Sequence, residues 1–399
     1  MPALWGVVRL TFFMLADLRT GRGTENVLFN LLRYIPENVE ITIIESDNLR
    51  QIRVSDDEVK KITSRCNIIK IHRHIYTTHS VVERVYVNAI LKPFYRDLKL
   101  ASSNGVLSEI RKTDIVYLFQ NEYSIFFKGM DIPIIGSGHT FTITDFVNRK
   151  DLLHKLYASY LYRTYFKGIN GFNYFPKDQS IFNKLQEKWH LKYNFSLSPG
   201  IDAKLFYPDN HKVGSKIKLL FIAALEYSKG LDILIPLIKK FDNEDRLEFH
   251  IAGTGPAERE LKGIESINFH GMLNNEHLAK LYRECDIFIY PSHNDQYPTV
   301  VTQALSSGLY VLAGDFFKGI FDDFGKYLEY VPMNVESFYK RINEIINDRK
   351  IIEHDKQEEY EYVRNNYDWS IIAKKFYDNM ENIYKEFYHD RNKQDDFRN

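Results

Sequence analysis

Short apolar runs alternate with helical stretches along the chain, and this alternation restricts the fold more than any other feature. Strand, helix and strand in repetition give parallel strands with helices on the faces of a sheet. In the second half the pattern predicts buried strands over 218–224, 247–252, 267–270, 286–290 and 310–313. In the first half it predicts strands over 7–15, 41–45, 67–72, 114–119 and 132–135. The expected class is therefore α/β.

Pro, Gly and Asp cluster over 198–209, which marks a boundary between two such domains. We therefore predict two doubly wound, Rossmann-like domains, 1–200 and 201–368. An amphipathic helix over 369–399 follows a break at 365–368. In sheets of this kind ligands bind at the carboxyl ends of the strands, so functional residues are expected in the loops that follow strands.

The charge is balanced overall but divided between the halves. Lys plus Arg and Asp plus Glu each number 53, which argues against a general nucleic-acid binder. Residues 1–200 hold 27 basic and 19 acidic side chains, a net of +8, and the rest of the chain therefore carries −8. Two domains of opposite sign indicate two different partners.

Cysteine content and hydropathy bear on location. Cys66 and Cys285 are the only cysteines, so a disulfide framework is not expected and a reducing compartment is the default. No run of 18 apolar residues is present, and the apolar start over 4–16 is too short to span a bilayer. We expect a cytoplasmic protein.

The most informative stretch is 290–308, YPSHNDQYPTVVTQALSSG. A buried strand leads through a polar loop that contains Asp295 into a helix that begins near Pro298 and Thr299. The free amides and positive end of that helix favour an anion or hydroxyl groups. Gln303 lies eight positions after Asp295, so the two side chains can meet separate parts of one extended ligand. The alternative is an ordinary capped strand–turn–helix.

This stretch resembles the GT-B glycosyltransferases, specifically the retaining enzymes of family 4. That family has Pro-Ser after the strand, then two glutamates separated by seven residues. Asp295 and Gln303 occupy the two glutamate positions here. The resemblance implies that Asp295 meets hydroxyl groups of the donor sugar and that Gln303 meets the ribose hydroxyls.

A second match is 219–234, LLFIAALEYSKGLDIL, which resembles the strand–loop–helix in which an Arg and a Lys hold the donor diphosphate. Lys229 occupies the Lys position, and Ala224 stands where the family has Arg, which removes a bidentate phosphate partner. A solvated surface lysine is the alternative for Lys229. The backbone at the start of the later helix is predicted to bind the donor, with its available N–H groups directed at the diphosphate; the residues concerned are Tyr297, Pro298 (which has no N–H of its own), Thr299 and Val300.

Two glycine turns extend the match. HIAGTGP over 250–256 is like the family's glycine turn, where Gly253 and Gly255 allow a tight bend near the ligand. The alternative is an ordinary turn with no role in binding. NFHGM over 268–272 is followed by the positions whose backbone contacts the nucleobase in relatives, which here are Met272 and Leu273.

The N-terminal half carries two weaker matches. Residues 22–25 (RGTE) resemble the Gly-Gly-x-Glu loop that closes on donor and acceptor; Arg22 replaces the first glycine, and Gly23 still permits backbone approach. GSGHT over 136–140 follows a predicted strand and places His139 at its end. Relatives have a histidine there at the reaction centre. A helix start and a structural histidine are the alternatives.

The resemblance also covers 198–208 and the aromatic start of the last helix at 367–369. It implies the GT-B architecture, with two Rossmann-like domains facing a cleft and a C-terminal helix that crosses back to the first domain. Residues 1–200 would bind the acceptor and 201–368 the nucleotide sugar.

The implied reaction is hexosyl transfer with retention from a nucleotide-diphosphate sugar, and the expected donor is a UDP-sugar. No other cofactor is expected. The implied catalytic residues are His139, Lys229 and Asp295. Lys229 and the helix amides would stabilise the leaving diphosphate, so we expect no metal. No two-carboxylate pair of the glycosidase type is needed.

The acceptor is less constrained. Residues 60–112 hold 11 basic and 3 acidic side chains, and 149–167 combine basic residues with tyrosines. Such segments are candidates for an anionic membrane surface, which would make the protein peripheral to the inner face of the membrane. We therefore predict a glycan or lipid-linked acceptor. An ordinary helix with a solvated basic face is the competing interpretation.

Two rival functions stay open from the sequence. Ala224 and Gln303 are compatible with a non-catalytic partner subunit that keeps the fold, and absence of nucleotide binding would favour it. A nucleotide-sugar epimerase on the same fold is the second rival, which product analysis distinguishes.

Overall fold

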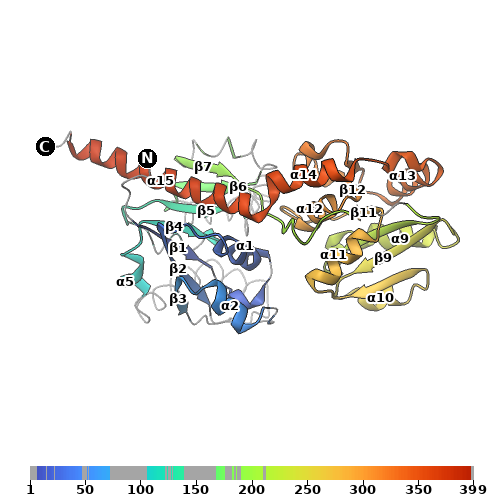
Figure 1. The fold of residues 1–399 in the computed structure, drawn as a ribbon, viewed down its shortest axis with the longest axis horizontal. Coiled ribbons are helices and arrows are strands. Elements are labelled where there is room, and N and C mark those ends of the chain that lie inside the picture. The colour runs from blue at the N-terminus through green and yellow to red at the C-terminus, as the bar shows by residue number, and fades with distance from the viewer. Residues whose placement is uncertain are drawn as a thin grey trace, which may run out of the picture. The chain divides into compact units, whose positions relative to one another are not determined.

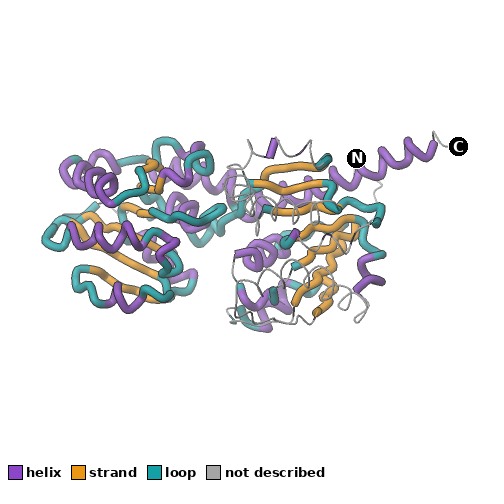
Figure 2. The backbone as a smooth tube through the Cα atoms, turned by 180° about the vertical axis from the view of Figure 1, so that it is seen from behind, coloured by secondary structure: helices purple, strands orange, loops and turns teal. Residues whose placement is uncertain are grey.

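The computed structural model describes residues 7–14, 16–21, 23–46, 52, 54–71, 106–121, 124, 127, 129–138, 168–175, 182–183, 186, 190–209 and 213–396. The chain divides into two compact units. Unit 1 comprises Met1–Leu197 and Ala373–Asn399, and unit 2 comprises Ser198–Ile372. In each unit the strands lie side by side in a single sheet with helices packed around it (Figures 1 and 2).

Unit 1 contains a seven-stranded sheet in the order β3-β2-β1-β4-β5-β6-β7, and every pairing is parallel. Its strands are β1 (Val8–Phe13), β2 (Val39–Ser46), β3 (Cys66–Ile71), β4 (Ile115–Leu118), β5 (Ile134–Ser137), β6 (Gly171–Tyr174) and β7 (Tyr193–Ser196). Its short helices are η1 (Leu18–Thr20), α1 (Gly23–Leu32), α2 (Asp56–Ile62) and α5 (Val106–Ile110). The α/β class predicted from the sequence is confirmed.

Helix α15 (Trp369–Asp396) passes along the sheet of unit 1 (Figure 1). Its Phe376 ring stacks on Phe12 of β1, with ring centroids 5.8 Å apart, and meets Tyr117 of β4 edge-on at 5.0 Å. Tyr377 is buried and its hydroxyl donates to the carbonyl oxygen of Leu31 at the end of α1, at 3.1 Å. The predicted return of the C-terminal helix to the first domain is confirmed.

The substitution Tyr377→Phe tests this attachment because it removes a single hydroxyl group. We expect the free energy of unfolding to fall by about 1 kcal/mol, since the substitution deletes one buried hydrogen bond and leaves the ring in place. Urea unfolding followed by circular dichroism measures the change. An unchanged midpoint would mean that the hydroxyl adds nothing to the docking of α15.

Unit 2 contains a six-stranded parallel sheet in the order β10-β9-β8-β11-β12-β13. Its strands are β8 (Ile217–Ile222), β9 (Leu247–Ala252), β10 (Ile267–Gly271), β11 (Ile287–Tyr290), β12 (Tyr310–Gly314) and β13 (Leu328–Val331). The main helices are α9 (Leu231–Lys240), α10 (Glu258–Lys262), α11 (Asn275–Arg283), α12 (Thr299–Ser306), α13 (Val335–Asn347) and α14 (Lys356–Tyr367), with 3₁₀ turns at η5 (Tyr227–Lys229), η6 (Asp315–Phe317), η7 (Asp322–Phe324) and η8 (Arg349–Ile352).

The core of unit 2 lies between its sheet and the pair α9 and α13. Alternate residues of β8 and β9, such as Leu219, Phe221 and Phe249, share one buried cluster with apolar residues of both helices. Helix α12 packs against β11 and β12, and α14 packs against α12. These layers leave the loops after β8, β9 and β11 at the carboxyl edge of the sheet. Among the described helices, none combines the length and the hydropathy required to cross a bilayer.

Candidate functional site

The candidate site lies where three neighbouring strands of unit 2 end. Strand β8 pairs with β9 on one side and with β11 on the other, so their following loops are adjacent at the carboxyl edge. Lys229 closes the η5 turn after β8, and Asp295 lies in the loop after β11. The topology therefore brings together residues that are 66 positions apart in sequence.

Lys229 and Asp295 contact each other directly. The Lys229 Nζ lies 2.8 Å from Asp295 Oδ1 and also donates to the carbonyl oxygen of Asn294 at 2.8 Å. Both side chains are about four-fifths covered, with exposed fractions of 20% and 23%. The sequence predicted that these residues contact different parts of one ligand; the structure shows that the ammonium and the carboxylate form an ion pair.

The second oxygen of Asp295 accepts two neutral hydrogen bonds. The Tyr290 hydroxyl donates to Asp295 Oδ2 at 2.5 Å, and the Ser292 Oγ donates to it at 3.1 Å. Burial, with the adjacent carboxylate, raises the pKa of Tyr290 well above its usual range, so the phenol stays protonated. Tyr290 was not predicted as a site residue. The feature of the sequence that could have indicated it is its position as the last residue of a predicted strand, five positions before Asp295.

The two loops are also joined through their backbones. The N–H of His293 donates to the carbonyl oxygen of Ser228 at 3.0 Å, and the His293 ring lies 3.0 Å from the Asp232 carboxylate. Gly230 packs so closely on the next loop that a Cβ there would lie 2.1 Å from the carbonyl oxygen of Pro291. The loop that carries Lys229 and the loop that carries Asp295 therefore form one packed unit.

Helix α12 begins at Thr299, as the sequence predicts, and Tyr297 and Pro298 before it are buried. Gln303 lies on this helix and is half-buried. The hydroxyl of the buried Tyr282 on α11 donates to the carbonyl oxygen of Val300 at 2.9 Å and lies 3.4 Å from Gln303 Oε1. The Tyr282 hydroxyl therefore helps to hold the side-chain amide of Gln303 in place. The sequence did not indicate this contact.

The predicted glycine turns pack against the loop after β8. A Cβ on Gly253 would lie 1.9 Å from the carbonyl oxygen of Ala223, and a Cβ on Gly255 would lie 2.6 Å from that of Leu225. Met272, just after β10, is 54% exposed, and Leu273 is half-buried. The turn over 250–256 is thus close-packed at this edge, whereas a Cβ on Gly271 of the second turn would meet nothing within 4 Å. Ala224, at the position where the family has Arg, is exposed.

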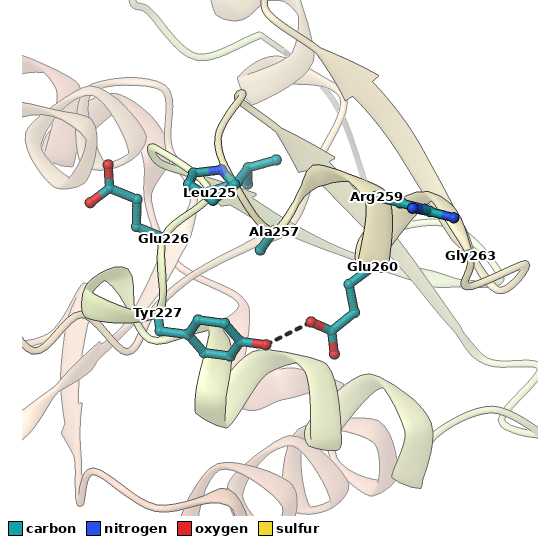
Figure 3. A pocket seen from close by; sticks show the side chains of 8 residues that line it. Leu225, Glu226, Tyr227, Ala257, Arg259, Glu260 and Gly263 are labelled. Carbon is teal, nitrogen blue, oxygen red and sulfur yellow. Dashed lines mark hydrogen bonds between the residues drawn. The ribbon is translucent and has the colours of Figure 1, made fainter.

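A cavity of about 770 Å³ opens beside this loop (Figure 3). The Tyr227 hydroxyl donates to Glu260 Oε2 at 2.7 Å, which links the η5 turn to α10 along one side of the cavity (Figure 3). The remaining lining residues are Leu225, Glu226, Pro256, Ala257, Arg259 and Gly263. None of the predicted site residues lines it, so this cavity is distinct from the Lys229–Asp295 pair.

The predicted site residues of the first half are only partly placed. Gly23 is the first residue of α1, and a Cβ there would meet nothing within 4 Å. His139 and Arg22 lie outside the described residues, as do the segment 149–167 and positions 72–105 of the segment 60–112. Within the part of the chain that the structure describes, no group of three His, Cys, Asp or Glu side chains could hold a metal ion.

Two parallel-sheet α/β units with a C-terminal helix returning to the first sheet define the GT-B glycosyltransferase fold. Sucrose-phosphate synthase from Thermosynechococcus elongatus shares it with a TM-score of 0.67 at 12% identity, covering 96% of this chain and 99% of that one. HepE from Anabaena, in complex with UDP-glucose, gives 0.64 at 14% identity, covering 94% and 99%.

The sequence comparisons agree with this fold. Residues 204–397 match the family model of glycosyl transferases group 1. An uncharacterized glycosyltransferase of Methanocaldococcus jannaschii is 26% identical over 230 residues, which cover 54% of this chain and 52% of the relative. The chain thus spans about half the length of that curated relative.

Proposed function

We propose that the protein transfers a sugar from a nucleotide-diphosphate sugar to a hydroxyl group of an acceptor. The observation that carries the proposal is the contact between Lys229 and Asp295 beside the first turn of α12. An ammonium and helix amides suit a diphosphate, and a fixed carboxylate suits sugar hydroxyl groups. The match of residues 204–397 to the family model of glycosyl transferases group 1 supports the same reaction class.

From this geometry we infer a part for each group in the reaction. Lys229 Nζ and Asp295 Oδ1 are 2.8 Å apart. A donor whose diphosphate contacts Lys229 and whose sugar contacts Asp295 would therefore have its sugar–phosphate bond next to this pair. As that bond breaks, negative charge grows on the diphosphate. Lys229 and the amides at the start of α12 would stabilise this charge without rearranging. Asp295 would hold the sugar in one orientation during the step.

The finer features of the reaction also belong to this proposal. We infer retention of configuration from the resemblance to the retaining enzymes of family 4. We infer no requirement for a metal, because Lys229 and the amides at the start of α12 would carry the charge of the leaving diphosphate. UDP is the favoured nucleotide, since the structurally similar HepE is seen with UDP-glucose. A glycan or lipid-linked acceptor at an anionic membrane surface is proposed from the basic and aromatic segments of the first half.

A panel of nucleotide sugars tests the proposal, with released nucleotide as the signal and calorimetry with UDP and GDP beside it. Nucleotide release coupled to a glycosylated product is the expected result. No binding of either nucleotide would favour a non-catalytic partner subunit. A changed sugar that stays attached to the nucleotide would instead favour an epimerase.

The substitution Gln303→Glu should tighten UDP binding about tenfold. A carboxylate accepts hydrogen bonds from ribose hydroxyl groups more strongly than an amide oxygen does, because those bonds are charge-assisted. Calorimetry with UDP measures the change. Gln296→Glu is the matched control, since it adds the same charge seven positions earlier, outside the assigned ribose position. Equal effects of the two substitutions would contradict the ribose assignment of Gln303.

A further inference from the structure

The carboxylate of Asp295 is held asymmetrically. Its Oδ2 accepts from Tyr290 at 2.5 Å and from Ser292 at 3.1 Å, and these two side chains are buried, with exposed fractions of 3% and 0%. Its Oδ1 accepts from Lys229, which is 20% exposed. One oxygen is therefore held by two buried neutral donors, and the other is held by an ammonium group that is partly exposed to solvent.

Tyr290 is itself held by packing. It ends β11, an interior strand of the sheet in unit 2. Its ring stacks on Phe288 and on Phe221, with centroids 5.8 and 6.5 Å away, and lies 5.5 Å from Phe317. A ring confined by three aromatic neighbours keeps its hydroxyl in one place. The direction of the Asp295 carboxylate is thus set from the core of the domain and not by the exposed loop.

We propose that Tyr290 is a positioning residue, which holds Asp295 Oδ2 so that Oδ1 and Lys229 Nζ face the sugar–diphosphate bond of the donor. The proposal rests on the proposed function. An aspartate side chain is one methylene group shorter than the glutamate of the resembling family. Its carboxylate can therefore reach the donor only over a narrow range of orientations. Without the phenol hydroxyl, Asp295 Oδ2 keeps only the longer hydrogen bond from Ser292, so the direction of the carboxylate about the Cβ–Cγ bond is less tightly fixed.

The functional test compares UDP with UDP-glucose. In Tyr290→Phe we expect UDP affinity to stay within about twofold of wild type, because Lys229 and α12 are untouched. The added affinity contributed by the glucose moiety should be lost, and kcat should fall about tenfold. An equal weakening of UDP and UDP-glucose would show that Tyr290 only supports the fold, and wild-type behaviour of the variant would overturn the proposal.

A double-mutant cycle tests the contact without using activity. Tyr290→Phe, Asp295→Ala and the double variant are compared by urea unfolding, and the double variant should be destabilised by less than the sum of the singles. Additive effects would overturn the proposal. Tyr310→Phe is the matched control. Tyr310 is a buried tyrosine on β12 whose hydroxyl donates to Glu329 Oε2 at 3.1 Å, away from the site. That variant should keep wild-type UDP-glucose binding.

The two experiments separate the two possible failures. If the wild-type protein binds neither UDP nor UDP-glucose, the proposed function fails for these donors, and the unfolding cycle still decides whether Tyr290 holds Asp295. If binding and transfer are present but the cycle is additive, the proposed function stands and the positioning role of Tyr290 is wrong.

Discussion

Replacing Lys229 by alanine is expected to lower the rate of sugar transfer by about a hundredfold or more. Among the residues that the structure describes, Lys229 supplies the ammonium group that pairs with Asp295, in the loop that leads into α12. Loss of a preorganised donor to a developing negative charge typically costs about 3 kcal/mol in the barrier. Initial rates of nucleotide release, measured at saturating and at low donor, give the loss in kcat and in kcat/KM.

The same measurement on Lys240→Ala provides the matched control. Lys240 also belongs to unit 2, and its Nζ lies 2.5 Å from Glu336 Oε2 on the surface. An exposed pair of this kind contributes at most about 1 kcal/mol to stability, so transfer should be unaffected. Lys229→Arg keeps the charge and should retain part of the activity. Full turnover in Lys229→Ala would exclude this lysine from the reaction.

The second large effect is expected from Gly230→Ala, which should lower the free energy of unfolding by about 3 kcal/mol. Gly230 has a φ of +87°, where a side chain is strained. A Cβ would in addition lie 2.1 Å from the carbonyl oxygen of Pro291, so one of the two loops must move. Overpacking against backbone adds about 1–3 kcal/mol to the cost of the left-handed conformation.

Gly319→Ala separates the two contributions. Gly319 has almost the same φ, +89°, but a Cβ there would meet nothing within 4 Å. The free energy of unfolding of this variant should therefore fall only by the cost of the left-handed conformation, about 1 kcal/mol. Urea unfolding of both variants measures the difference. Equal losses would mean that the contact between Gly230 and Pro291 relaxes without cost.

The sequence predicted those parts of the site that depend on local spacing. Lys229 before Gly230 and Asp295 after a Pro-Ser pair each follow a buried strand, and strand ends in a parallel sheet share one edge. The start of α12 at Thr299 was predicted for the same reason, because the strand, loop and helix are contiguous in the chain. The assigned roles of these residues stay predictions until donor binding is measured.

The parts that were not predicted depend on tertiary packing. Lys229 and Asp295 are far apart in sequence, so no local pattern indicates that they pair with each other. From the sequence, Tyr290 was only the last residue of a predicted strand and Tyr282 had no predicted role, whereas the fold directs both hydroxyl groups at site residues. Strands β6 and β7 are four residues long, and their sequences GFNY and YNFS lack the apolar run that marks a buried strand.

The pairing of Lys229 with Asp295 also bears on how a donor is captured. Long-range attraction guides an anionic molecule toward a net positive charge, and this guidance weakens as ionic strength rises. Because Asp295 compensates the ammonium group at 2.8 Å, these two residues present a dipole to a distant diphosphate. Under the proposed function, we therefore expect this loop to select the donor after collision, when Lys229 would exchange or share its carboxylate partner with an incoming phosphate.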